Sequence, residues 1–93
     1  MLQNRFLVLH KEERSAYLLG YPLSLSPLEF DLLYTIADEP LIDAPALVER
    51  LHHALAITTV PVHIHAINKK AYEISGRKLI AHAEDGYAIY LQM

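Results

Sequence analysis

The sequence predicts an α+β fold: an N-terminal antiparallel sheet, three helices and a C-terminal β-hairpin. Three observations lead to this prediction. Short apolar runs separated by turn residues occupy residues 1–25, apolar residues recur at helical spacing over residues 26–74, and the apolar period falls to two in residues 77–93. A chain of 93 residues has the length of one domain. We therefore expect a single domain over residues 1–93, divided at these boundaries.

The opening segment predicts a small antiparallel meander. The charged residues 11–14 are typical of a turn, and Gly20 and Pro22 interrupt the chain again. Between these breaks lie three runs suited to short strands, at residues 5–10, 15–19 and 23–25.

The first helix has a well-defined start at residues 26–29, SPLE. We expect Ser26 as the N-cap, Pro27 as the first helical residue and Glu29 at the third position, which together form a capping box. A wide apolar arc predicts burial on two sides of this helix, and Pro40 marks its end. The rest of its surface is assigned to Asp31, Tyr34, Thr35 and Asp38.

Apolar spacing predicts two further helices. The second follows Asp43 as its N-cap and covers residues 44–55. A short turn at residues 57–59 precedes the third helix, residues 59–74, which tolerates Pro61 in its first turn. The buried stripe of the third helix is predicted at Ile64, Ile67, Ala71 and Ile74.

The chain closes with a predicted hairpin, whose strands cover residues 78–83 and 87–91. They are joined around Asp85-Gly86, a dipeptide typical of hairpin turns. Three helices followed by a terminal hairpin is the order of a winged helix-turn-helix. The third helix is then the recognition helix, and residues 81–89 form the wing.

Composition excludes several function classes. The chain has no cysteine, which excludes disulfides and thiolate metal sites. No apolar run approaches the roughly 18 residues of a membrane span. Residues 1–9 carry no cationic leader, so we expect a cytoplasmic protein with no membrane partner. With three glycines, no phosphate-binding run and no nucleophile motif, we expect no enzyme activity and no cofactor.

The net charge of −3 argues against a uniformly basic nucleic-acid binder. Its distribution is uneven. Residues 1–58 carry four Lys/Arg against eight Asp/Glu, a balance of −4, whereas residues 59–93 carry four against three, a balance of +1. Only the C-terminal third leans toward an acidic partner.

Three segments resemble the C-terminal effector domain of the OmpR/PhoB family of response regulators. Residues 23–33, LSLSPLEFDLL, resemble the family's LTPLEFDLL at the start of its first helix. Residues 60–64, VPVHI, with Lys69-Lys70 resemble its VDVHI..LRKKL recognition helix, and Leu79-Ile80 with Gly86-Tyr87 resemble its LI.TVRGVGYRL wing.

The resemblance covers essentially the whole chain and implies a four-stranded N-terminal sheet, a third helix in the major groove of DNA and a role in transcriptional regulation. The family's receiver domain is not part of this sequence, so we expect any input signal to be missing or supplied by another chain. Where the family has SRLRKKL, residues 65–71 read HAINKKA, and both arginines of RLR are replaced. The wing arginine is replaced around residues 83–85, and the loop at residues 56–59, where the family contacts its protein partner, is shorter.

We expect double-stranded DNA as the partner, bound weakly or only by a homodimer that presents two recognition helices. The candidate surface offers roughly two to four phosphate contacts, against about 6–10 in a strong binder. Protonation of its histidines at acid pH would add positive charge. The candidate DNA-contacting residues are His63, His65, Asn68, Lys69 and Lys70 on the helix, with Arg77 and Lys78 beside the wing.

A second interpretation is a winged-helix module that binds a protein partner and has lost DNA binding. The replaced arginines, the acidic Glu84-Asp85 turn and the net charge favour it. Val62 and Ala66 would then belong to an apolar contact. A continuous positive stripe along the third helix and wing would support the first interpretation, and a neutral apolar patch the second.

The histidines do not predict a metal site. Adjacent helical positions, as in His52-His53, and positions two apart, as in His63 and His65, diverge by roughly 100–200° and cannot chelate alone. His82 would have to join them from the hairpin. The aromatic residues Tyr72, Tyr87 and Tyr90 are predicted to pack in the core or at its rim rather than to stack on bases.

Overall fold

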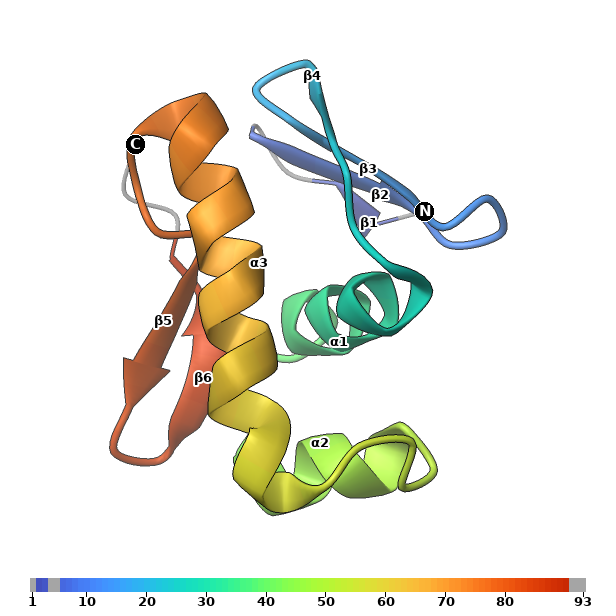
Figure 1. The fold of residues 1–93 in the computed structure, drawn as a ribbon, viewed down its shortest axis with the longest axis vertical. Helices are drawn as coiled ribbons and strands as arrows, with labels where there is room; N and C mark the ends of the chain where they lie inside the picture. Colours follow the sequence, from blue (N-terminus) through green and yellow to red (C-terminus); the bar gives the residue numbers. More distant parts are fainter. Residues whose placement is uncertain (1, 4–5, 91–93) are drawn as a thin grey trace.

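The observed order of elements is the predicted one: an N-terminal sheet, three helices and a C-terminal hairpin (Figure 1). The computed structural model describes residues 2–3 and 6–90. The elements are β1 (Leu2–Gln3), β2 (Leu7–His10), β3 (Ser15–Leu18), β4 (Tyr21–Leu23), α1 (Pro27–Ala37), α2 (Ala44–Arg50), the 3₁₀ turn η1 (Ile57–Thr59), α3 (Val60–Ser75), β5 (Ile80–Ala83) and β6 (Gly86–Ile89). The predicted winged-helix fold is confirmed.

The N-terminal sheet is antiparallel, with strand order β1-β2-β3-β4. Leucines and alanine alternate inward along β2 and β3, as a half-buried sheet requires. The third predicted strand, residues 23–25, is wrong by two residues, since β4 is Tyr21–Leu23 and includes Pro22. Proline is accepted there because β4 is an edge strand. Of the first predicted strand, Arg5 lies outside the described residues.

The capping box that starts α1 is confirmed. Ser26 Oγ accepts the Glu29 N–H at 3.2 Å, and a Glu29 carboxylate oxygen accepts the Ser26 N–H at 2.8 Å. The helix ends at Ala37, with Asp38 as its C-cap. Thr35, predicted to be among the solvated residues, is instead 7% exposed, and its hydroxyl is satisfied there because it donates to the Asp31 carbonyl at 2.8 Å.

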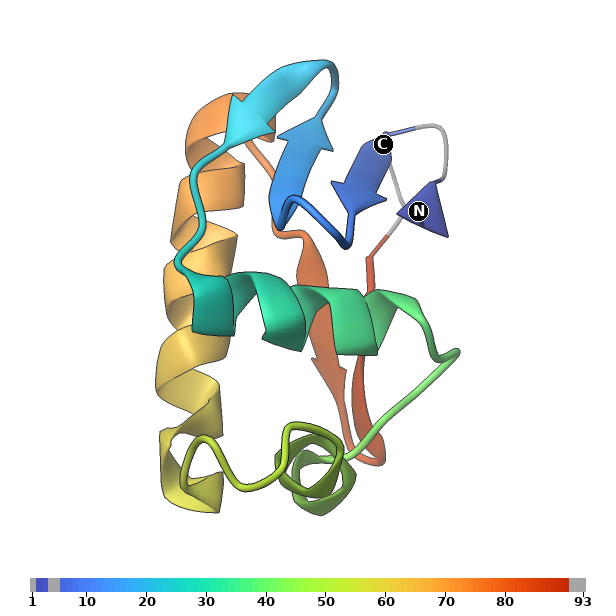
Figure 2. The same cartoon turned by 90° about the vertical axis from the view of Figure 1, so that its right-hand side faces the viewer.

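Helix α1 occupies the centre of the molecule. It contacts α2, α3 and β6, and it passes between the N-terminal sheet and α2 (Figures 1 and 2). Its burial on two sides is therefore as predicted. The buried core around it consists of Leu7, Leu9, Ala16, Leu18, Leu23, Phe30, Leu32, Leu33, Ile36, Ile42, Leu47, Leu55, Val60, Ile64, Ile67, Ala71, Leu79, Ile80 and Tyr87.

Helix α2 begins after its Asp43 N-cap, as predicted, but it stops at Arg50 rather than at residue 55. The next residues leave the helix, since His52 and His53 adopt φ values of 53° and 58°. Histidine is one of the few residues with a Cβ that is enriched in this left-handed region. Leu55 still reaches the core, but from the loop that follows.

The terminal hairpin is tied to the connection between α1 and α2. Ile42 and Tyr87 exchange two backbone hydrogen bonds, of 3.0 and 2.7 Å, which adds a bridge at the side of β6. The hairpin turn is Glu84–Asp85, with Ala83 paired to Gly86. Gly86 is thus the first residue of β6 rather than part of the turn, and its φ is 144°. A Cβ on Gly86 would lie 2.5 Å from the Ile42 carbonyl oxygen.

We predict that Gly86→Ala lowers the free energy of unfolding by about 3 kcal/mol, since the substitution adds both backbone strain and a backbone clash. Gly20→Ala is the matched control, because Gly20 also has a positive φ but no atom lies within 4 Å of its ideal Cβ. The control is expected to lose about 1–2 kcal/mol. Urea unfolding of both variants measures the difference, and equal losses would contradict the close approach at Ile42.

Candidate nucleic-acid interface

Helix α3 has one buried face and one face that points away from the core. The buried face is formed by Val60, Ile64, Ile67 and Ala71, with Ile74 partly buried, which confirms the predicted stripe. Pro61 stands in the first turn, where its missing N–H is tolerated. The outward face carries the exposed residues Val62, His65, Lys69, Tyr72 and Glu73.

A shallow groove lies beside this outward face, where α3 meets the chain leading into β5. Its volume is about 440 Å³. We call it the α3 groove, and its lining residues are His65, Asn68, Lys69, Tyr72, Glu73 and Lys78. Four of the seven predicted contact residues therefore come together here: His65, Asn68, Lys69 and Lys78.

Asn68 is held inside this arrangement by the backbone of β5 and the residue before it. Its Oδ1 accepts the N–H groups of Leu79 at 3.0 Å and Ile80 at 2.7 Å, and its Nδ2 donates to the Ile80 carbonyl at 2.9 Å. Reading adenine requires the same acceptor and donor pair. Asn68 therefore fixes β5 against α3 and is removed from the set of proposed DNA contacts.

Lys70 points toward α1 rather than toward the α3 groove. Its Nζ donates to a Glu29 carboxylate oxygen at 2.6 Å, the same oxygen that accepts the Ser26 N–H. Burial of Glu29 acts to raise the pKa of its carboxyl, but the hydrogen bonds from Lys70 and Ser26 outweigh it and leave the pKa below its ordinary value of 4.5. The charge of Lys70 is thus already balanced within the domain.

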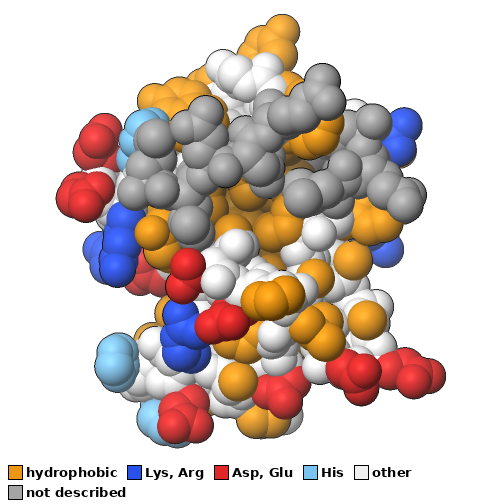
Figure 3. All heavy atoms as spheres, turned by 180° about the vertical axis from the view of Figure 1, so that it is seen from behind, with side chains coloured by type: hydrophobic (Ala, Val, Ile, Leu, Met, Phe, Trp, Pro, Cys, Tyr) orange, Lys and Arg blue, Asp and Glu red, His pale blue; other side chains and the backbone are white. Residues whose placement is uncertain are grey.

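The remaining predicted residues lie around the groove. His63 is half-buried on α3, whereas Arg77 is exposed in the segment that joins α3 to β5. At the hairpin tip, Glu84 and Asp85 are exposed. Seen from behind, acidic side chains project at the lower right, on the side where this tip lies (Figure 3). Positive charge therefore does not continue from α3 onto the tip of the wing.

The sequence predicts that Tyr72 packs in the core or at its rim, and the structure corrects this prediction. It is 60% exposed, whereas Tyr87 is 4% exposed and packs in the core as predicted. The exposure of Tyr72 could have been predicted from the helical register. Position 72 lies three residues after Lys69, and positions three apart share one side of a helix, here the outward side. Tyr90 is 40% exposed, at the surface.

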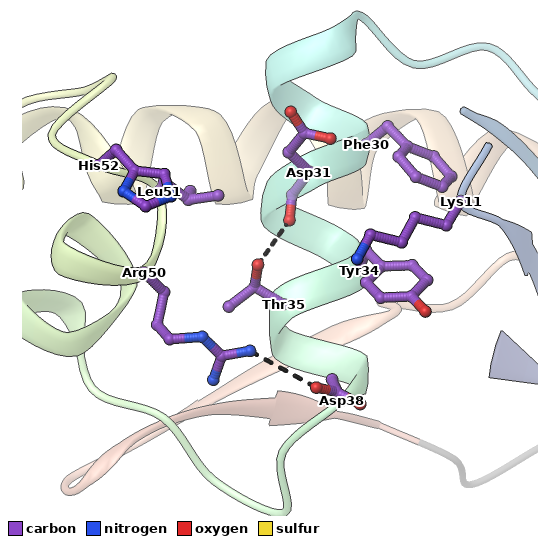
Figure 4. A pocket seen from close by; sticks show the side chains of 9 residues that line it. All are labelled: Lys11, Phe30, Asp31, Tyr34, Thr35, Asp38, Arg50, Leu51 and His52. Carbon is purple, nitrogen blue, oxygen red and sulfur yellow. Dashed lines mark hydrogen bonds and ion pairs between the residues drawn. The ribbon is translucent and has the colours of Figure 1, made fainter. Parts of the chain in front are cut away.

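A second concavity, of about 370 Å³, lies between α1 and the end of α2 (Figure 4). Its charged side chains are engaged with neighbours, since Arg50 bonds Asp38 and Lys11 lies 5.5 Å above the ring of Tyr34. Figure 3 shows charges of both signs interspersed over the rear of the molecule. The ion pairs of the described residues are Arg14–Asp31 (3.1 Å), Arg50–Asp38 (3.4 Å), Arg50–Glu39 (2.8 Å) and Lys70–Glu29 (2.6 Å).

Within residues 2–3 and 6–90, Lys69 and Lys78 make neither an ion pair nor a ring contact. Both are exposed and both line the α3 groove. Their charges are accordingly available to an anionic partner.

Among the described residues, no three His, Asp or Glu side chains are placed to hold a metal ion. His82 instead stacks on Tyr87, with ring centroids 4.4 Å apart. In the same part of the chain, no helix has the length and apolar character needed to cross a membrane.

Comparison with known proteins shows a shared fold. Neither a protein-family model nor a curated protein matches the sequence. Among solved structures, a streptococcal redox sensor evolved from two-component response regulators superposes with a TM-score of 0.81 at 22% identity, covering 95% of this chain and 41% of that protein. This chain thus spans less than half the length of that sensor.

Two isolated domains match over nearly their whole length. The DNA-binding domain of the response regulator AdeR, in complex with an intercistronic region, has a TM-score of 0.77 at 19% identity, covering 94% of this chain and 95% of that domain. The DNA-binding domain of RstA from Klebsiella pneumoniae, in complex with the RstA box, has a TM-score of 0.75 at 23% identity, with 95% and 94% covered. The expected winged-helix fold is confirmed, and it is shared with these response-regulator domains.

We predict that Asn68→Ala lowers the free energy of unfolding by about 2–4 kcal/mol, because two backbone N–H groups lose their acceptor. Asn68→Asp, which keeps the acceptor and loses the donor, should lie between Asn68→Ala and the wild type. Lys69→Ala is the control on the exposed face and is expected to change stability by less than about 0.5 kcal/mol. Thermal and urea unfolding measure all three, and a wild-type stability of Asn68→Ala would refute the structural role of this amide.

A second prediction concerns the carboxylate of Glu29. Because folding lowers its pKa, its stabilising contribution is complete above the unfolded value of 4.5 and is lost as the pH falls through the lower folded value. Glu29→Gln should cost about 1 kcal/mol at pH 7 and show a shallower loss of stability toward pH 3 than the wild type. Parallel curves of stability against pH for the two proteins would contradict a lowered pKa of Glu29 in the folded state.

Proposed function

We propose that this chain is a DNA-binding domain of a transcription regulator, with α3 in the major groove and the β5–β6 hairpin beside it. The observation that carries the proposal is the location of the described lysines that make neither an ion pair nor a ring contact. The described Lys and Arg side chains without a partner, Lys69 and Lys78, both face the α3 groove. Lysine and arginine contacts to phosphates supply most non-specific DNA affinity. The fold adds support, since the AdeR and RstA domains that share it are described in complex with an intercistronic region and an RstA box.

The proposed contacts differ in part from those that the sequence alone suggests. Lys69 and Lys78 neutralise phosphates, His65 lines the groove, and His63 and Arg77 flank it. Asn68 and Lys70 are left out, because their polar atoms already bond to β5 and to Glu29. With so few contacts, the affinity of one copy is low, and a homodimer on two half-sites would raise it.

A module that binds a protein is the alternative function, and one observation favours it. Val62 is 65% exposed and Tyr72 60% exposed on the outward face of α3, while the wing tip is acidic. The surface is therefore neither a continuous positive stripe nor a neutral apolar patch. A DNA-binding domain should bind a duplex with an affinity that falls steeply as salt rises, whereas a protein-binding module should not bind the duplex.

We predict that the double variant Lys69→Ala/Lys78→Ala binds a labelled generic duplex about tenfold more weakly than the wild type at 50 mM salt. The slope of log affinity against log salt should fall by about two, since two phosphate contacts are lost. Fluorescence anisotropy between 50 and 200 mM salt measures both, with light scattering to give the mass of the bound species.

The matched control is Lys11→Ala/Arg14→Ala, which removes the same charge from the turn between β2 and β3. It should leave the salt slope close to that of the wild type. Equal effects of the two double variants would mean that affinity follows net charge alone and not α3. The absence of binding at 50 mM salt would move the assignment to a protein partner.

A further inference from the structure

The outward face of α3 lacks the groups that usually read base edges in DNA. Arginine, asparagine and glutamine make the common bidentate contacts to guanine and adenine. Helix α3 has no arginine or glutamine, and its only asparagine, Asn68, is bonded to Leu79 and Ile80. The hydrogen-bonding groups that this face can still offer to bases come from His65, Lys69, Tyr72 and Glu73, and only Glu73 among them is a carboxylate that could accept from cytosine.

The same face does offer apolar groups at its N-terminal end. Val62 is 65% exposed in the first turn, and Ala66, four residues later, lies on the same side of the helix and is partly exposed. Neither side chain belongs to the buried stripe, which is carried by Val60, Ile64 and Ile67. A β-branched residue is also not favoured in a helix. Neither core packing nor helix stability therefore explains a valine at position 62.

The position of these residues matches the part of a recognition helix that meets base edges. In helix-turn-helix domains the N-terminal residues of that helix contact the bases. The major groove presents one apolar group, the C5-methyl of thymine, and aliphatic side chains contact it directly. Val62 and Ala66 are spaced one helical turn apart, so they can meet methyl groups on neighbouring base pairs.

Resting on the proposed function, we propose that Val62 and Ala66 read thymine methyl groups in the major groove. The domain then selects thymine-rich sites through apolar contacts, and Lys69 and Lys78 hold the backbone. In this proposal Val62 and Ala66 determine the sequence preference, and Lys69 and Lys78 determine the salt-dependent affinity. Each property can therefore be removed by its own substitutions.

The test compares two 24-bp duplexes of the same A·T-rich sequence, one with thymine and one with deoxyuridine at every thymine position. The two differ only by the C5-methyl group, so their phosphates and minor-groove edges are the same. We expect the wild-type chain to bind the thymine duplex about three- to tenfold more tightly, the range that burial of one or two methyl groups gives. A G·C duplex with 5-methylcytosine should likewise bind more tightly than the same duplex without the methyl groups.

Two variants assign the preference. Val62→Ala should reduce the thymine-to-uracil ratio to below about twofold and leave the salt slope unchanged. Leu41→Ala removes another exposed aliphatic side chain, 44% exposed against 65% for Val62, from the connection between α1 and α2, which lies across the molecule from α3 (Figure 2), and should keep the full ratio. Both positions are exposed, so both variants should fold.

Three results would overturn the inference. Salt-dependent binding with equal affinity for thymine and uracil duplexes would reject methyl readout and leave DNA binding intact. A thymine preference that survives Val62→Ala would assign the preference to duplex shape rather than to this side chain. The absence of binding to either duplex at 50 mM salt would reject the inference together with the proposed function.

Discussion

One carboxylate, that of Glu29, connects the two helices on which the interface depends. Its oxygen closes the N-terminus of α1 through the Ser26 N–H and accepts the Lys70 ammonium of α3. The orientation of α3 relative to the central helix is thereby set by a short, charge-assisted contact in addition to core packing. Asn68 performs the corresponding task on the other side of α3, where it holds the chain entering β5. Helix α3 is thus bonded on one flank to α1 and on the other to the chain entering β5.

This construction has an electrostatic consequence. Arg14, Arg50 and Lys70 are each paired with carboxylates of the same domain, so three of the seven described Lys and Arg charges are balanced internally. Exposed pairs of this kind contribute little to stability, but they do cancel the field that would attract a polyanion. What remains beside α3 is a short region in which Lys69 of the helix and Lys78 of the segment that follows it stand near apolar side chains. A surface of that composition favours close contact in a groove over long-range attraction.

The fold could be predicted from the sequence because its elements follow local rules. The site could be predicted only in part, because some of its residues make long-range contacts. The capping box depends on four consecutive residues and was predicted atom by atom. The end of α2 was not, because its apolar spacing continues to Leu55 while His52 and His53 turn the backbone into a left-handed conformation. The partners of Asn68 and Lys70 are 12 and 41 residues away, and no sequence pattern joins them. Both residues have the type expected of a DNA contact, yet the folded chain uses them internally.

Pro22 has a consequence for how copies of the molecule can associate. It lies in β4, at the edge of the four-stranded sheet, where an incoming strand would look for backbone N–H groups. Proline has none to donate, so pairing of a second strand along β4 is disfavoured. Two copies brought together edge to edge at β4, on adjacent half-sites or at high concentration, would lack a backbone donor at the point of contact. Association at this edge is therefore left to side chains.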